Sequence, residues 1–170
     1  MNGTAQTLTK ATPAEADDVR QLVISAAVSS GLTAITLWRP SAGRRAVGIF
    51  FALTGLVWNG ILTAKAPEQY PMLARRAPWG WYRRLGLALT EPAPRVFGAA
   101  MTAGETALAA AVLSRDPSTR LGLLGVAAFL LGITPLGTYT LGNPILAAGV
   151  LHLARRPWPT AAFHRRRRSS

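Results

Sequence analysis

Long apolar runs alternate with short charged turns along most of this chain. The clearest run, residues 96–114, has no Lys or Arg and a single acid, Glu105, at its tenth position. As a helix it would extend roughly 28 Å at about 1.5 Å per residue, which is close to the hydrocarbon thickness of a bilayer. The pattern predicts a membrane-spanning helix with a carboxyl group near its middle.

Three further runs predict spans over residues 46–64, 121–136 and 139–154. Each is nearly free of charge, and basic residues flank the group as Arg44–Arg45 and Arg155–Arg156. Only a few residues separate the last two runs, so they should form an antiparallel hairpin.

Residues 21–38 are apolar but marginal for a span. Four hydroxyl residues in this segment, Ser25, Ser29, Thr33 and Thr36, share one helical face. Two interpretations remain open. The segment is a weak fifth span that packs through its hydroxyl face, or it is a helix that lies in the membrane interface.

The connection over residues 65–95 mixes aromatic and basic side chains. We expect one or two short interfacial helices here, with breaks near Pro71, Pro78 and Pro92. Amphipathic aromatics and long basic side chains are typical of the headgroup layer. The expected interfacial anchors are Trp79, Trp81, Tyr82, Arg83 and Arg84.

The predicted fold is all-α: an integral membrane four-helix bundle with an additional N-terminal apolar helix. The chain divides into a polar N-terminal segment (1–20), a membrane domain (21–156) and a basic C-terminal tail (157–170) that contains Arg165–Arg168. At 170 residues there is room for one domain.

Composition excludes several kinds of chemistry. The chain has no Cys, so disulfides and thiol nucleophiles are ruled out. No metal-binding His motif, phosphate-binding loop or nucleophile elbow is present. The net charge of +12 comes mainly from Arg residues that flank apolar runs. Anionic lipid is therefore the expected partner, and nucleic acid is disfavoured.

The distribution of basic residues gives an orientation. With four spans, 13 Lys and Arg lie on the side of both termini and 6 on the other, which predicts cytoplasmic termini in the cell membrane. If residues 21–38 also span, the split becomes 8 against 11 and discriminates little. The charge pattern thus favours four spans.

The order of these features resembles the DoxX-like membrane proteins. The resemblance rests on Arg44–Arg45 before GIFFALTGLVWNG, the long loop, FGAAMTAGETALAAAVL with Glu105, and RLGLLGVAAFLLG after a charged turn. It covers about residues 44–156 and implies a four-helix bundle. It also implies a membrane subunit linked to redox chemistry and to quinone, because some family members are described as subunits of a thiosulfate:quinone oxidoreductase.

Glu105 is the main candidate for a functional residue. An ionised acid in hydrocarbon costs on the order of 3 kcal/mol or more, so its side chain should face the bundle. It either exchanges protons or contacts a quinone, or it is a neutral group that packs through a hydrogen bond. Counting residues from the flanking Arg side chains puts Thr54 at the same depth, with Asn59 and Thr102 as further neighbours.

Three other residues are weaker candidates. His152 lies three residues before Arg155, so an interfacial position is favoured over a proton partnership with Glu105. Trp58 suits interfacial anchoring better than stacking on a quinone ring. Asn143, just before Pro144, suits a helix cap better than a ligand contact.

The function expected from these features is a non-catalytic membrane component or scaffold of a redox- or quinone-linked complex. Its expected partners are lipid, a redox protein and a second copy of the chain. The alternative is a small proton-coupled transporter that uses Glu105. A catalytic activity of its own is the least favoured, because the spans offer no nucleophile and no metal site.

Overall fold

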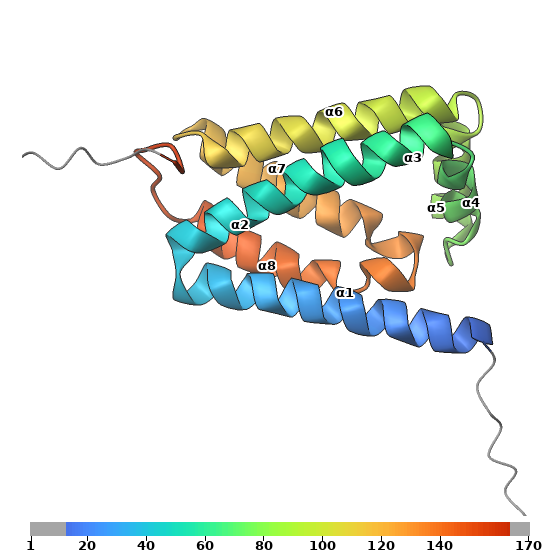
Figure 1. Cartoon of the computed structure of the whole chain (residues 1–170), viewed down its shortest axis with the longest axis horizontal. Coiled ribbons are helices and arrows are strands. Elements are labelled where there is room, and N and C mark those ends of the chain that lie inside the picture. Colours follow the sequence, from blue (N-terminus) through green and yellow to red (C-terminus); the bar gives the residue numbers. More distant parts are fainter. Residues whose placement is uncertain (1–12, 164–170) are drawn as a thin grey trace, which may run out of the picture.

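The computed structural model describes residues 13–163, and in this range it contains helices and turns but no strand (Figure 1). This confirms the all-α class. The basic run 165–168 lies outside the described residues. The longer helices are α1 (Pro13–Trp38), α2 (Pro40–Leu53), α6 (Pro94–Leu113) and α7 (Ser118–Ile133). The shorter elements are η1 (Thr54–Asn59), α3 (Gly60–Lys65), α4 (Gln69–Arg75), α5 (Gly80–Thr90), η2 (Thr134–Leu136), η3 (Thr138–Thr140) and α8 (Asn143–Ala154).

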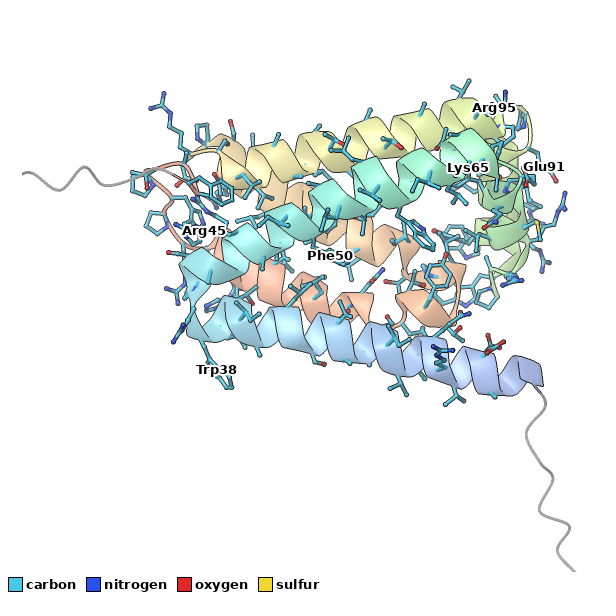
Figure 2. The ribbon with its side chains drawn as sticks, in the orientation of Figure 1. Trp38, Arg45, Phe50, Lys65, Glu91 and Arg95 are labelled. Carbon is cyan, nitrogen blue, oxygen red and sulfur yellow. The ribbon has the colours of Figure 1, made fainter. Side chains whose placement is uncertain are left out.

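The long helices run side by side between two ends of an elongated bundle (Figure 1). We call one the Arg44 end; it holds the turns between α1 and α2 and between α6 and α7, together with residues 155–163. We call the other the Tyr70 end; it is covered by α4 and α5. Figure 2 shows labelled charged residues at both ends, Arg45 at the first and Lys65, Glu91 and Arg95 at the second.

Four helices are long and apolar enough to cross a membrane. They are Ala16–Trp38, Pro40–Lys65, Pro94–Leu113 and Ser118–Leu136. Only 11 to 33% of their most apolar windows is buried inside the bundle, so most of this apolar surface faces outward. Water rarely tolerates so large an apolar surface, whereas lipid requires it.

One of these four helices is not among the four spans predicted from the sequence. The run 139–154 was expected to form a span, but its helix, α8, has only 12 residues. Residues before it form the two 3-10 turns η2 and η3 around Gly137, whose φ of 157° suits glycine. The fourth long helix is α1 instead. The antiparallel packing of α7 and α8 expected for the hairpin is present.

Helix α1 belongs to the bundle and does not lie beside it as an interfacial helix. Its hydroxyl face packs against α8 and the turn before it. The Gly142 amide donates a hydrogen bond to Ser25 Oγ at 3.1 Å, and Thr33 Oγ1 donates to the Ile145 carbonyl at 3.0 Å. Thr36 is fully buried on the same face. Small and hydroxyl side chains allow this close approach in an apolar environment.

The core lies between α2, α6, α7 and α8. Aliphatic side chains fill it with almost no exposure, among them Val47, Val112, Leu123 and Leu146. Phe51 from α2 meets the ring of Phe129 from α7 edge to face at 5.7 Å. Aromatic pairs in this arrangement add to the stabilisation that burial provides.

Residues 157–163 fold across the Arg44 end, although the sequence placed them in a basic tail. Arg44 is 4% exposed, donates to the Thr160 carbonyl at 3.1 Å and lies over the Trp158 ring at 4.5 Å. The Trp158 amide donates to the Asp116 carboxylate at 2.5 Å. The segment thereby ties the two turns at this end together.

The predicted orientation, with both termini in the cytoplasm, stays a prediction, because both termini lie outside the described residues. Residue 13 starts α1 at the Tyr70 end, whereas residue 163 lies at the Arg44 end (Figure 1). Because α1 joins the bundle, the chain runs along its axis five times, and an odd number of passes separates the two described ends.

Candidate functional site

A cavity of about 700 Å³ occupies the half of the bundle toward the Tyr70 end. Parts of α2, η1, α4, α5, α6, α7 and the turns before α8 surround it. Its walls are largely aliphatic and aromatic, and the aromatic lining consists of Phe50, Phe51, Trp58, Tyr70, Tyr82, Phe97, Phe129 and Tyr139. Cavities that hold small molecules typically have this lining with a few polar groups among it.

Glu105 is the acid in the wall of this cavity. Its side chain is 5% exposed, and Oε2 is buried without a hydrogen-bond partner. Thr54 and Asn59 are the polar side chains nearest to the carboxyl group. Within the described residues no Lys, Arg or His forms an ion pair with it. The carboxyl group therefore keeps hydrogen-bonding capacity that the protein itself does not use.

The helix opposite Glu105 has an unusual form. Residues Thr54–Asn59 make one turn of π-helix inside the otherwise α-helical stretch from Pro40 to Lys65. The wide turn buries Gly55 and Asn59 toward α6 and leaves Trp58 70% exposed. A Cβ at Gly55 would lie 2.9 Å from the Glu105 Cβ, so the missing side chain is what admits Glu105. Single π turns of this kind occur often at functional sites.

A second polar cluster lies beside the acid, toward the Tyr70 end. Tyr70 Oη donates to Asn59 at 3.3 Å and lies 3.0 Å from Thr63 Oγ1. Burial raises the pKa of the Tyr70 phenol, and the hydrogen bond with Thr63 partly opposes this effect. The phenol therefore stays a hydrogen-bond donor at neutral pH.

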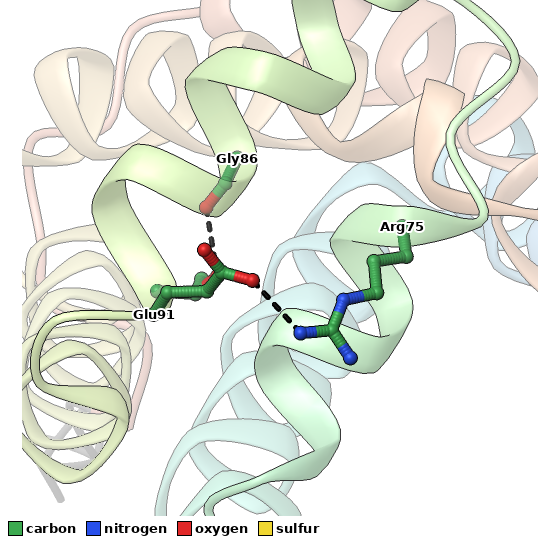
Figure 3. A network of polar contacts seen from close by, with 4 residues as sticks. Arg75, Gly86 and Glu91 are labelled. Carbon is green, nitrogen blue, oxygen red and sulfur yellow. Dashed lines mark hydrogen bonds and ion pairs between the residues drawn. The ribbon is translucent and has the colours of Figure 1, made fainter.

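The helices α4 and α5 cover the cavity at the Tyr70 end. They are joined by an ion pair between Arg75 of α4 and Glu91, which follows α5, at 2.8 Å (Figure 3). Within α5, the Thr90 hydroxyl donates to the Gly86 carbonyl at 2.8 Å. Both partners of the ion pair are about half exposed, so the pair contributes little to stability.

One or two short helices were expected over 65–95, and two are present, α4 and α5. Pro71 lies within the first turn of α4 and does not break it. Proline is tolerated in a first turn because the amide it lacks has no partner there. Trp79 and Trp81 are exposed and stacked with ring centres 6.3 Å apart, and Arg83 and Arg84 are exposed. Tyr82 differs, since its hydroxyl donates to the Gly132 carbonyl and its ring lines the cavity.

The structure brings together some of the residues that the sequence suggested and separates others. Thr54 and Asn59 lie at the carboxyl group of Glu105. Thr102 lies on α6 with its hydroxyl buried and unpartnered, and its carbonyl faces Gly55. Trp58 lines the cavity edge. His152 lies 3.2 Å from Arg156 and is not part of the cavity lining.

Asn143 has a different role from the cap that the sequence suggested. The N-cap position of α8 is Gly142, and no side chain caps this helix. Asn143 Nδ2 donates instead to the Leu130 carbonyl at 3.3 Å, and the residue lines the cavity. It thus joins α8 to α7 beside the cavity.

Sequence reasoning did not identify Tyr70, Met101 or Phe129 as site residues. Tyr70 carried an interfacial signal like its aromatic neighbours, and Met101 and Phe129 are ordinary apolar residues of their runs. Only the packing of distant segments assigns them to the cavity wall.

The described residues contain no group of His, Cys, Asp or Glu that could hold a metal ion. The arrangement can bind an uncharged or weakly polar group through Glu105, Asn59 and Tyr70, with apolar contacts around it. Comparison with family models, with curated proteins and with solved structures finds no match for this chain. Fold and site together define a helical bundle with four helices suited to cross a membrane, built around one buried acid.

Proposed function

We propose that this chain is a multi-pass membrane protein that binds a small, largely apolar ligand of the quinone class in the cavity beside Glu105. In this proposal it is DoxX-like and serves as a non-catalytic membrane component for a redox partner. The observation that carries the proposal is the unpartnered Oε2 of Glu105 in the wall of an aromatic-lined cavity of about 700 Å³.

The chemistry of a quinone suits these walls. Its flat ring can stack on aromatic side chains, and its carbonyl oxygens accept hydrogen bonds. A protonated Glu105, the Asn59 amide and the Tyr70 phenol are the donors nearby. Glu105 would hold the ring in place and could exchange a proton when a partner protein changes the redox state of the ring.

The transporter alternative receives less support from the packing. A carrier needs a polar path on both sides of its binding site. On the Arg44 side of Glu105 the bundle is filled by apolar residues such as Val47, Val112 and Leu123, each fully buried. A binding component therefore fits the described residues better than a proton-coupled carrier.

The same proposal includes an orientation in the cell membrane. Counted along the whole sequence for five passes, the basic residues split 11 against 8, a small difference that depends on the run Arg165–Arg168 after the Arg44 end. Positive loops tend to stay cytoplasmic. We place the Arg44 end in the cytoplasm, where anionic lipid would contact its Arg residues.

The test measures quinone binding to the protein in lipid nanodiscs, and the change in the fluorescence of its Trp residues reports the binding. Glu105→Leu keeps a similar size but removes the hydrogen-bonding atoms of the side chain, so it should weaken binding about tenfold or more, as expected for a lost hydrogen bond to a buried group. Glu91→Leu, the same change in a half-exposed acid, is the matched control and should leave the affinity unchanged.

Thermal unfolding of the same variants separates function from packing. If Glu105→Leu binds quinone as the unaltered chain does and changes only the unfolding temperature, the acid is structural and the proposal fails. Proton flux into vesicles that is lost in Glu105→Gln would favour the transporter instead. Extraction in mild detergent, with identification of copurifying proteins, tests the redox partner.

A further inference from the structure

A second hollow lies on the outside of the bundle, between α6 and α7. It is a groove of about 490 Å³. Small residues of α6 form one wall at helical spacing, and the start of α7 forms the other; the main lining residues are Ala100, Gly104, Ala107, Ala111, Leu121 and Gly122. Ala100, Gly104, Ala107 and Leu121 are exposed, so the groove faces the surroundings of the bundle.

Three residues line both the groove and the cavity: Met101, Glu105 and Phe129. The side chains of Met101 and Phe129, both half-buried, are therefore the partition between the two hollows. Met is unbranched and adapts its shape at little cost, so such a partition can open locally. Glu105 is only 5% exposed, and its Oε2 has no hydrogen-bond partner. It lines both the groove and the cavity.

We infer that the groove holds the hydrocarbon chain of the ligand whose polar ring lies in the cavity at Glu105, so that the ligand is a long-chain amphiphile with an uncharged head. The inference rests on the proposed function. Its independent support is the continuity of the two hollows through three shared residues. The groove faces the region in which a lipid-soluble chain would lie, and its small side chains leave the width that a chain needs.

Two matched probes test this in nanodiscs of fixed lipid composition: a benzoquinone without a chain and the same ring with a decyl chain. The concentration of each probe is expressed as moles of bilayer-bound probe per mole of lipid, so that the different partitioning of the two probes into the bilayer does not affect the comparison of their affinities. The chained probe should bind at least about fivefold more tightly, because a chain held in a groove gains contacts that lipid does not fully replace.

Gly104→Phe should remove this advantage. A Cβ at Gly104 meets no atom within 4 Å, so the ring would fill the groove without disturbing the core. The affinity of the chained probe should fall to within about twofold of the chainless one, whose own affinity should not change. Gly31→Phe on α1 is the matched control, since its Cβ also meets nothing within 4 Å, and it should alter neither affinity.

A second measurement uses the unaltered chain. A decyl benzoquinone with a diazirine at the end of its chain is photoactivated, and the labelled residues are identified by mass spectrometry. Labels should fall on α6 and α7 residues of the groove and disappear with excess unlabelled probe. Labels confined to α1 or α3 would overturn the inference.

The outcomes also separate the two proposals. If neither probe binds, the proposed function fails, and this inference with it. If both bind equally and Gly104→Phe has no effect, only the inference fails. If Gly104→Phe instead converts a dimer into a monomer in detergent, the groove is an interface between copies of the chain, and the inference is again overturned.

Discussion

At the scale of single residues, Glu105 and Tyr70 show how this bundle keeps polar groups in an apolar interior. Gly55 gives Glu105 room, and Asn59 connects the acid to the phenol of Tyr70. Tyr70 is 6% exposed, and its ring contacts Phe97 edge to face at 5.4 Å. Asn59 lies in η1 and Tyr70 in α4, whereas Glu105 lies in α6, so the polar cluster is assembled from three separate segments of the chain.

Tyr70 should make stability depend on alkaline pH. Because burial raises the pKa of its phenol, the folded protein keeps the proton at a pH where the unfolded chain, with a pKa of about 10, releases it. Stability is thus unaffected below pH 10 and falls as the pH rises above it. Unfolding temperatures measured in detergent between about pH 8 and 11 should show this decline.

Tyr70→Phe provides the check on that prediction. The variant loses the hydrogen bonds to Asn59 and Thr63, so it should be less stable by about 1 kcal/mol at neutral pH. Its alkaline decline should be shallower than that of the unaltered chain, with the remainder coming from Tyr82 and Tyr139, whose pKa values burial also raises. An unchanged slope would mean that Tyr70 is not the titrating group.

At the scale of elements, close helix contacts at small residues set how α6 and α7 cross. A Cβ at Gly122 would lie 2.7 Å from the Ala111 Cβ and 2.8 Å from the Val112 amide nitrogen. These are backbone approaches that only glycine permits. The crossing point also fixes the groove, because Ala111 and Gly122 lie at one end of it.

Gly122→Ala should therefore destabilise the bundle by about 1 to 3 kcal/mol, since the backbone of α6 would have to move. Gly132→Ala on the same helix is the control. Its Cβ meets nothing within 4 Å, so the helix propensity of Ala should leave stability equal or raise it by up to about 1 kcal/mol. Unfolding temperatures measured in one detergent give the comparison, and equal effects of both changes would contradict this account.

At the scale of the whole molecule, five passes of the chain put the two described ends at opposite ends of the bundle (Figure 1). The buried Arg44 and residues 157–163 hold the turns at one end, while α4 and α5 cover the cavity at the other. The molecule is thus asymmetric along its axis, with the polar cluster in one half and a tightly packed apolar core in the other.

Cysteine labelling can test this arrangement directly, because the chain has no Cys of its own. Single substitutions at exposed positions, Asp17→Cys and Glu68→Cys at the Tyr70 end and Ser118→Cys and Arg155→Cys at the Arg44 end, are made in turn. A maleimide that does not cross membranes, added to intact cells, should label the first two and not the others. Labelling of Asp17→Cys from the side of Ser118→Cys, with Glu68→Cys labelled from the other side, would show that α1 does not span.

The sequence by itself determined the helical class and most of the apolar segments. The run 96–114 corresponds to α6, Pro94–Leu113, and the run 46–64 lies within the stretch Pro40–Lys65. Such segments are predictable because hydropathy and helix length are local properties, which the bilayer thickness selects. The depth of Glu105 and its neighbourhood with Thr54 followed from counting residues along two helices.

Only the tertiary structure decided the rest. It replaced the expected span 139–154 by the short α8, brought α1 into the bundle, and turned Asn143 and Tyr82 toward the cavity. The π turn at Thr54–Asn59 and the shared wall of Met101 and Phe129 have no local sequence signal. The physical reason is that these features depend on which helix faces meet, and that is settled by close packing between segments distant in sequence.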